Sequence, residues 1–465
     1  MMSLIPTIKA VGSIKEVISI FFSALAVSIN ISCAGLQPIP VEAYAEESAT
    51  LFENLPAPLK SAEVDVLYAT DRAPDSDHEI LLYGNDRSSS LAFGFARVSL
   101  GKDLSWSDLV SWSQSKNPEP VDIEPFVTSV TEVARLPSSP YPYELNRNGQ
   151  PILGAQFSQQ LSTAQATIQN TIRERLELTE RKNIYIHVHG IKSQLGDTLI
   201  EAAFTYHLFG RQGVPIVYSW PAGQSGLLRG YTGDRESGEF TVFHLKEFIR
   251  TITAIDEVEK INFTAHSRGT DVILTALREL IIEARASGKD PHRSLKLSNL
   301  VLLAPDLDAS VASQRVIAEA LTFSLDRLTV YTNNHDGAIA IATKLFANRQ
   351  RLGNYDVSEV TERQKESLKR FKNYDIIFYS GEGGGLLEHS YYRSPAMLAD
   401  YFLLLEGKKP GASNGRPLEP LGEYMWGMDD CNQQCAGRTA LGSYQLLSRI
   451  QTPSNLFSIN VENFG

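Results

Sequence analysis

The segment from Lys260 to Leu280 reads K-I-N-F-T-A-H-S-R-G-T-D-V-I-L-T-A-L-R-E-L. A short apolar run leads into Ala265-His266-Ser267-Arg268-Gly269, and the apolar residues that follow recur at helical spacing. A strand, a tight turn that carries a serine between small residues, and then a helix are typical of a nucleophile elbow. The alternative interpretation is an ordinary turn between a strand and a helix, with a buried serine.

The residue types around Ser267 fit the chemistry of such a turn. The serine must stand on a strained turn, and the close approach of strand and helix leaves room only for small residues two positions away. Gly269 satisfies this requirement, and Ala265 occupies the first small position, where glycine is common. The backbone N–H of Arg268, at the start of the helix, would then face the oxyanion of an acyl-transfer intermediate.

The surrounding sequence alternates between strands and helices. We expect strands at 183–190, 214–221, 300–304, 328–331 and 374–379, and helices at about 155–180, 198–209 and 239–255. This alternation predicts an α/β fold with a doubly wound, mostly parallel sheet. β-like runs at 64–70, 81–84 and 91–100 predict N-terminal additions to that sheet, whereas residues 101–150 show no clear pattern. Functional residues are expected at the carboxyl ends of the parallel strands.

A serine nucleophile needs a base and an acid, and in this kind of fold they follow it in the order Ser, Asp or Glu, His. Ser267, Asp336 and His389 satisfy that order, with each partner on a loop after a separate strand. We predict that these three residues form a catalytic triad. Asp306 and Asp308, which follow the preceding strand, stay open as alternatives for the acid.

A second backbone donor is expected from the loop after the strand that ends in His189-Gly190. This assigns Ile191 or Lys192 as the donor, through the main chain. We interpret His189 itself as a structural hydrogen-bonding residue beneath the loop, with a role as base as the alternative.

Residues from about 64 to 405 resemble a bacterial α/β-hydrolase family of unknown function within the esterase/lipase superfamily. The shared motifs, in chain order, are Thr70-Asp71-Arg72, Tyr83-Gly84-Asn85-Asp86-Arg87, Val188-His189-Gly190-Ile191-Lys192, Ser219-Trp220-Pro221-Ala222, Tyr231 to Asp234, His266-Ser267-Arg268-Gly269, Pro305-Asp306-Leu307-Asp308, Asn334-His335-Asp336 and His389-Ser390-Tyr391. The resemblance implies an α/β-hydrolase fold at 61–406 and a serine hydrolase, either a carboxylesterase or a lipase-like enzyme that forms an acyl-enzyme. We expect no cofactor and no metal.

Two departures from the family pattern lie beside the predicted oxyanion donors. Ile191-Lys192 replaces Tyr-Asn after His-Gly, and Arg268 replaces Met after the serine. Because both positions act through the backbone, activity is retained in this interpretation. Their side chains lead us to expect a more cationic entrance and a preference for an anionic or polar substrate head group.

Two other function classes stay open. The same triad handles amide, thioester and peptide bonds, and it does not by itself separate these from esters. A non-catalytic α/β-hydrolase scaffold used for binding is the third reading. The expected partner is a small-molecule or lipid ester. The formal net charge of −11 argues against nucleic acid, and the oligomeric state is not predicted.

The two ends of the chain are expected to differ from the domain between them. Residues 1–34 have the charged, apolar and small-x-small regions of a secretory signal peptide, so we expect export to the periplasm or the exterior. Lipidation at Cys33 would anchor the protein to a membrane. Residues 35–60 are expected to form a linker, and 407–465 a C-terminal extension in which Cys431 and Cys435 form a local disulfide.

Overall fold

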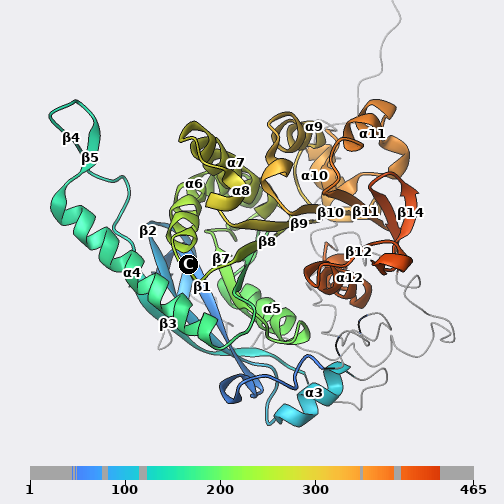
Figure 1. Cartoon of the computed structure of the whole chain (residues 1–465), viewed down its shortest axis with the longest axis horizontal. Coiled ribbons are helices and arrows are strands. Elements are labelled where there is room, and N and C mark those ends of the chain that lie inside the picture. The colour runs from blue at the N-terminus through green and yellow to red at the C-terminus, as the bar shows by residue number, and fades with distance from the viewer. Residues whose placement is uncertain are drawn as a thin grey trace, which may run out of the picture.

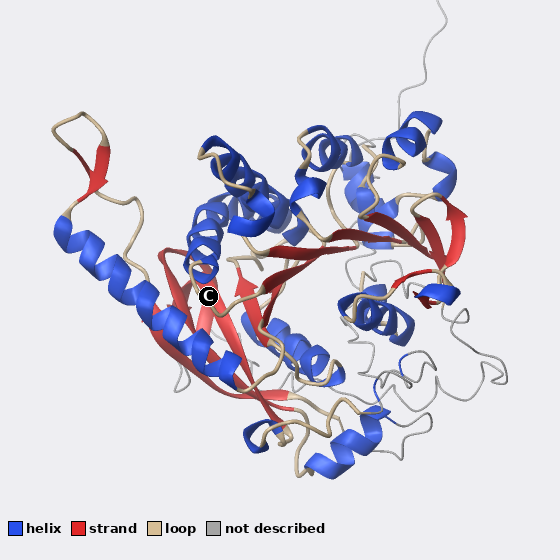
Figure 2. Cartoon of the chain, viewed as in Figure 1, coloured by secondary structure: helices blue, strands red, loops and turns tan. Residues whose placement is uncertain are grey.

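The computed structural model describes Tyr44, Ser48 and residues 50–75, 82–114, 123–345, 349–381 and 389–429. An eleven-stranded sheet runs through the molecule in the order β14-β15-β11-β10-β9-β8-β6-β7-β1-β2-β3. The strong twist of this sheet is visible in Figures 1 and 2. Its central eight strands, from β15 to β1, run parallel, and the antiparallel strands β14, β2 and β3 lie at the two ends.

The strands of this sheet are β1 (Glu63–Asp75), β2 (Leu82–Ser99), β3 (Phe126–Arg135), β6 (Asn183–Val188), β7 (Val214–Ser219), β8 (Lys260–His266), β9 (Leu297–Leu303), β10 (Arg327–Thr332), β11 (Tyr374–Tyr379), β14 (Glu419–Gly422) and β15 (Met425–Met428). Two short pairs stand apart from it, β4 (Tyr143–Leu145) with β5 (Pro151–Leu153) and β12 (Lys409–Pro410) with β13 (Gly415–Arg416). The central strands are almost continuously apolar because helices cover both of their faces.

The helices are α3 (Trp106–Gln114), α4 (Ala155–Glu177), α5 (Leu195–Leu208), α6 (Leu227–Thr253), α7 (Gly269–Ala286), α8 (Pro291–Ser294), α9 (Ala309–Ser313), α10 (Gly337–Leu345), α11 (Glu362–Leu368) and α12 (Pro395–Leu405). Apolar side chains of α4, α6 and α7 form one buried cluster with the sheet, and those of α5 and α12 form a second cluster on the other face. Figure 1 shows these two helical layers on either side of the strands. The doubly wound arrangement expected from the alternation of strands and helices is therefore present.

The direction of winding reverses at β6. The chain passes from β6 through α5 to β7 on one side, and the 27-residue helix α6 then carries it back to β8 on the other side of β6. In open parallel sheets, the crevice outside the strand ends at such a reversal is where ligands bind. The loops after β6 and β8, which carry Ile191 and Ser267, meet at this point.

Parts of the chain outside the predicted domain contribute to it. β15 pairs in parallel with β11, so the sheet continues past the predicted boundary at residue 406. Arg416, fully buried, pairs with Asp400 of α12 and fixes this C-terminal segment. The expected linker also packs on the domain in its described part, because Phe52 and Leu55 are buried. The sheet also includes β3, which lies in the stretch 101–150 that showed no clear pattern.

The β4–β5 hairpin projects from the body of the molecule at the N-terminal end of α4 (Figure 2). Its two strands pair only with each other within the described structure. The turn is closed by Asn146, whose side-chain oxygen accepts hydrogen bonds from the N–H groups of Asn148 and Gln150. Gly149 completes the turn with a φ of +72°.

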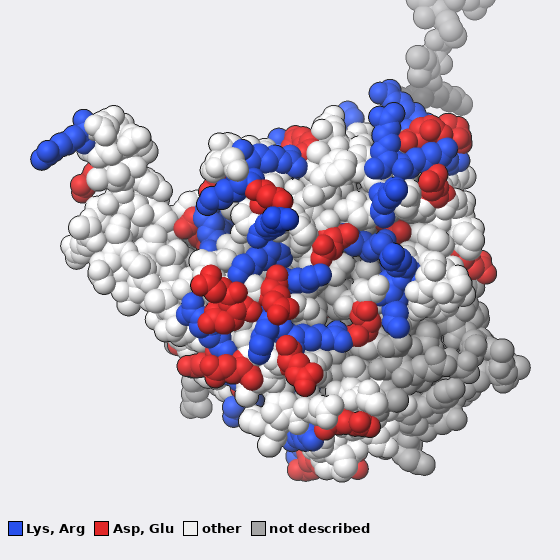
Figure 3. Space-filling view, in the orientation of Figure 1, with Lys and Arg blue, Asp and Glu red and all other residues white. Residues whose placement is uncertain are grey.

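The signal segment, Cys33 and the cysteine pair lie outside the described residues, so export, lipidation and the disulfide stay predictions. Among the residues that are described, no helix is both long and apolar enough to cross a membrane. On the face of the molecule in Figure 3, basic and acidic side chains are interspersed.

Candidate active site

Ser267 stands on a strained turn between β8 and α7. Its φ is +52°, in the left-handed region that non-glycine residues rarely adopt. The turn is held from both sides: the Ser267 N–H donates to Leu303 O at 2.9 Å, and Asp306 N–H donates to Ser267 O at 3.1 Å. Ser267 is 3% exposed. A serine on a strained turn between a strand and a helix has the geometry of a nucleophile elbow.

Two glycines bring the elbow against the loop after β6. A Cβ on Gly269 would lie 2.3 Å from His189 O, and one on Gly190 would lie 2.8 Å from Ser267 Cβ. Neither position has room for a side chain. The need for small residues around the serine, inferred from the sequence, has its physical cause in this contact between the two loops.

His389 and Asp336 form a close pair. The Nδ1 atom of His389 lies 2.6 Å from Asp336 Oδ2, and the other carboxylate oxygen accepts the Ile339 N–H of α10 at 3.0 Å. The carboxylate is buried, which favours a strong charge-assisted hydrogen bond. The opposite ring atom, His389 Nε2, is buried and has no hydrogen-bond partner among the described residues.

The His389 ring lies next to the elbow. Its centroid is 4.6 Å from that of His266, the residue before Ser267, and His266 Nε2 lies 3.2 Å from His389 O. Burial, followed by the nearby His389, lowers the pKa of His266 well below its usual value, so His266 is neutral. Because His389 Nε2 has no described partner, no hydrogen bond joins it to Ser267 in this structure.

The two alternative acids are engaged elsewhere. Tyr231 donates its hydroxyl to Asp306 Oδ2 at 2.5 Å, and Arg351 Nε lies 3.4 Å from Asp306 Oδ1. Asp308 caps α9 by accepting the N–H groups of Ser310 and Val311. Of the three aspartates considered from the sequence, Asp336 is the one that contacts His389.

The expected backbone donors behave differently from one another. Neither Arg268 N–H nor Ile191 N–H donates a hydrogen bond to any described residue. Lys192 N–H, in contrast, donates to Asp234 Oδ2 at 3.0 Å. Of the two candidates after β6, Ile191 is therefore the one whose N–H can donate a hydrogen bond to an oxyanion.

The expectation of a cationic entrance fails at Arg268. Its side chain is 6% exposed and forms an ion pair with Asp271, which also pairs with Arg315. The serine-flanking arginine is thus a buried, neutralised group that fixes the first turn of α7. Of the two residues that depart from the family pattern with a charged side chain, Lys192 is the exposed one.

His189 has the structural role expected from the sequence. Its ring stacks on Trp220, with centroids 5.3 Å apart and planes at 11°, and its Nδ1 lies 2.7 Å from Gly190 O. Burial, followed by the charge of Arg72, lowers its pKa well below the usual value. A neutral ring that is hydrogen-bonded on both sides is suited to support and unsuited to act as the base.

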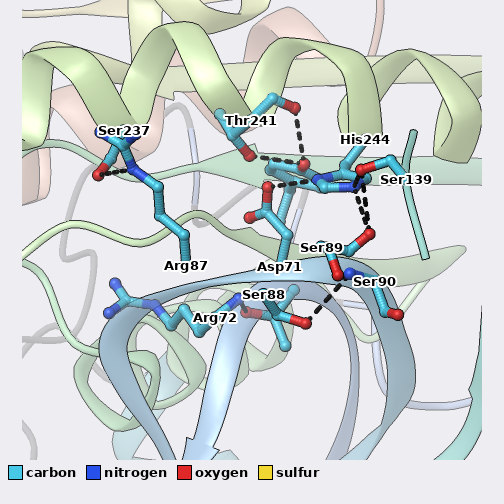
Figure 4. A network of polar contacts seen from close by, with 12 residues as sticks. Asp71, Arg72, Arg87, Ser88, Ser89, Ser90, Ser139, Ser237, Thr241 and His244 are labelled. Carbon is cyan, nitrogen blue, oxygen red and sulfur yellow. Dashed lines mark hydrogen bonds and ion pairs between the residues drawn. The ribbon is translucent and has the colours of Figure 1, made fainter.

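Arg72 is the centre of the network beneath the loops. It donates to the carbonyl oxygens of Ser193 at 2.7 Å and Ala222 at 2.9 Å, and to Ser219 Oγ at 2.9 Å. Burial lowers its pKa to about 10, so the guanidinium remains charged at neutral pH. Its neighbour Asp71 points instead toward His244 of α6, 2.9 Å away (Figure 4).

These residues belong to motifs that the sequence reasoning used only as marks of resemblance. Arg72 comes from Thr70-Asp71-Arg72, and Asp234 ends the segment that begins at Tyr231. Their common feature is a charge at a fully buried position. An ionisable residue inside a strand that is otherwise apolar, such as Arg72 within β1, is a signal in the sequence of a buried charge with dedicated partners.

A cavity of about 90 Å³ lies between α5 and α12, on the face of the sheet opposite α6 and α7. Its lining includes His187, Glu201, Thr264 and Tyr392 but none of the predicted triad. It approaches the site through Tyr392, whose ring lies 4.3 Å from that of His266. Among the described residues, no group of His, Cys, Asp and Glu is arranged to hold a metal ion.

The parallel sheet, the strained serine turn at its topological reversal and the adjacent His–Asp pair define an α/β hydrolase. A family model described as "Alpha/beta hydrolase of unknown function (DUF900)" matches residues 164–407, more than half of the chain. The chain belongs to that family. The family predicted from the sequence motifs is thereby confirmed.

Comparison with curated proteins gives no match. Among solved structures, the "putative cell surface hydrolase from Lactobacillus plantarum WCFS1" is 14% identical over 55% of this chain and 93% of its own, with a TM-score of 0.25. The Fe-lacking apo form of ESTFA is 12% identical over 54% of this chain and 67% of its own, with a TM-score of 0.19. TM-scores this low carry no argument about the site.

Proposed function

We propose that the protein is a serine hydrolase that cleaves carboxylic esters through Ser267, His389 and Asp336. The observation that carries the proposal is the strained Ser267 turn at the start of α7, next to a histidine whose Nδ1 is held by a buried carboxylate and whose Nε2 has no hydrogen-bond partner in the part of the chain that the structure describes. A nucleophile and a base oriented by an acid are the elements of nucleophilic catalysis of acyl transfer.

In the proposed reaction, Ser267 Oγ attacks the acyl carbon while His389 Nε2 takes the hydroxyl proton. Asp336 keeps the proton on His389 Nδ1 and stabilises the imidazolium. The tetrahedral oxyanion accepts the N–H groups of Arg268 and Ile191, and the first of these also lies at the positive end of the helix dipole. His389 then protonates the leaving alcohol, and a water molecule hydrolyses the acyl-enzyme by the same steps in reverse.

A fluorophosphonate probe tests the nucleophile directly, because it phosphonylates only an activated serine. We expect the wild-type protein to be labelled, Ser267→Ala to be unlabelled, and His389→Ala to be labelled at least about 10³-fold more slowly. Ser313→Ala, a serine of α9 outside the site, is the matched control and should be labelled like the wild type. Labelling that persists in Ser267→Ala would exclude this assignment.

Ester, thioester and anilide substrates with the same acyl group separate the chemical classes that the triad leaves open. We expect p-nitrophenyl esters to give the highest kcat/KM. A higher value for the thioester or the anilide would replace the ester in the proposal while leaving the triad in place. A wild type that is neither labelled nor active on any of the three would favour a binding scaffold instead.

A further inference from the structure

The main chain around Ile191 is fixed by two side chains that come from different parts of the molecule. A trans peptide is planar, and its C=O and N–H point in opposite directions. All the peptides of this loop are trans, since the only cis bond among the described residues precedes Pro140. Holding one end of a peptide unit therefore fixes where its other end points.

His189 holds the peptide before Ile191. A carbonyl oxygen can only accept, so the 2.7 Å contact between His189 Nδ1 and Gly190 O requires the proton on Nδ1. Nε2 is then an acceptor, and it lies 3.2 Å from Ser219 Oγ and 3.4 Å from Arg72 Nη2. With Gly190 O turned toward the His189 ring, the Ile191 N–H points the opposite way.

Asp234 holds the peptide after Ile191. Its Oδ2 accepts Lys192 N–H at 3.0 Å, which supports the left-handed Lys192 (φ +58°) and turns that N–H away from the site. The same carboxylate accepts Gly223 N–H at 3.0 Å and Gln224 N–H at 3.0 Å. One fully buried side chain of α6 thus ties the loop after β6 to the loop after β7.

Arg72 ties the same two loops together through Ser193 O and Ala222 O. A buried carboxylate and a buried guanidinium therefore hold one short segment between them, and each attracts the other across it. An N–H group stabilises an oxyanion effectively only when it is oriented before the reaction. A loop that is fixed at the peptide units before and after Ile191 holds the Ile191 N–H in one orientation.

We propose that His189 and Asp234 are positioning residues, which keep the Ile191 N–H in the orientation of an oxyanion-hole donor. This inference rests on the proposed function, because it assigns the two residues to the transition state of that reaction. Both side chains are buried, His189 with 1% and Asp234 with 0% of its surface exposed, so we expect them to act through the loop and not by contact with the substrate. Their loss should lower kcat while leaving KM nearly unchanged, since the oxyanion exists only in the transition state and the intermediates.

Asp234→Asn tests the carboxylate, because the new amide has one acceptor oxygen in place of two and presents an NH₂ to a backbone N–H. We expect kcat on a p-nitrophenyl ester to fall by about 10²-fold, with KM changed by less than about threefold. Asp71→Asn is the matched control, since Asp71 is equally buried and bonds His244 of α6 without touching either loop. It should lower the melting temperature and keep kcat within about twofold of wild type.

A pair of substitutions tests His189. In His189→Asn the side-chain amide can donate to Gly190 O from near the position of Nδ1, whereas His189→Phe keeps the stacking on Trp220 and loses the donor. We expect the phenylalanine variant to lose about 10²-fold in kcat and the asparagine variant to recover at least tenfold of that loss. If Asp234→Asn fails to fold, the two His189 variants still test whether the Ile191 N–H is positioned as proposed.

An aryl boronic acid, which forms a tetrahedral adduct on a reactive serine, provides a readout that a merely structural role would not move. Its affinity should fall in Asp234→Asn and His189→Phe by about the same factor as kcat/KM. Folded variants that keep wild-type kcat and boronate affinity would overturn the positioning role of His189 and Asp234 while the esterase proposal stands. A wild type that neither turns over esters nor reacts with the fluorophosphonate would overturn both.

Discussion

At the scale of single residues, the site depends on how closely the elbow approaches the loop after β6. Gly269 has no room for a side chain, because a Cβ there would meet two backbone carbonyl oxygens, those of His189 at 2.3 Å and Val188 at 2.5 Å. Backbone atoms cannot rotate out of the way as a side chain can. The close approach at Gly269 therefore helps to set the position of Ser267 without contacting the serine side chain.

Gly269→Ala should destabilise the fold by about 3 kcal/mol, at the upper end of the range for overpacking, and should reduce the fluorophosphonate labelling rate. Gly196→Ala is the control, because a Cβ at this position of α5 has no neighbour within 4 Å and alanine favours a helix by up to about 1 kcal/mol. Urea unfolding of both variants measures the difference. Equal stability of the two would show that the strand and helix have room to separate.

The residues of the predicted triad are those whose pattern is local in the sequence. Ser267, Asp336 and His389 could be predicted from their order and from the strands that precede them, and the structure places His389 against Asp336. The arrangement of Asp234 with Lys192 could not be predicted, since it joins residues 42 apart through the path of α6. The burial of the Arg268 side chain was also missed, although its ion-pair partner Asp271 lies only three residues away; Asp271 pairs in addition with the distant Arg315.

At the scale of elements, the predicted strands and helices of the parallel region are all present because their apolar periodicity is strong. The parts that were missed lie at the ends of the sheet. β3 mixes polar and apolar residues without regular alternation and is only partly buried, and β15 is four residues long in a Gly- and Pro-rich stretch. Such short or two-sided strands are specified by the neighbour they pair with, and that neighbour is distant in sequence.

The C-terminal strands depend on Arg416, which is fully buried and bonded to both oxygens of Asp400. Arg416→Met would leave Asp400 buried without its counter-charge, so we expect a loss of about 3–5 kcal/mol in the free energy of unfolding. Arg278→Met removes an ion pair with Glu319 at the surface and should change stability by less than about 1 kcal/mol. Chemical denaturation distinguishes the two. A small effect at Arg416 would mean that the segment after residue 406 folds independently of the domain.

At the scale of the whole molecule, several histidines are buried in the neutral state. His189, His207 and His266 all have pKa values well below the usual one, and burial is the main cause for each. The folded protein therefore binds fewer protons than the unfolded chain once the pH falls below about 6.5, the ordinary pKa of histidine. The stability that is fully present above that pH is lost as the pH falls.

We expect the free energy of unfolding to decrease between pH 6.5 and 5 by up to about 1.4 kcal/mol per pH unit for each of these histidines. His207→Asn removes one of them while keeping an acceptor for Arg211 Nε, which donates to His207 Nδ1 at 3.2 Å. The slope of stability against pH should become shallower by about one proton in this variant. Urea unfolding at several pH values measures both slopes, and parallel curves would show that His207 titrates alike in the folded and unfolded protein.

The projecting β4–β5 hairpin has a practical consequence. Its strands pair only with each other, and its turn closes on its own side chains, so the sheet and the site place no demand on the sequence at its tip. A fluorophore or an affinity peptide inserted beside Gly149 would stand clear of the body of the molecule. The hairpin thus provides a handle for immobilising the enzyme with its loops after β6 and β8 left intact.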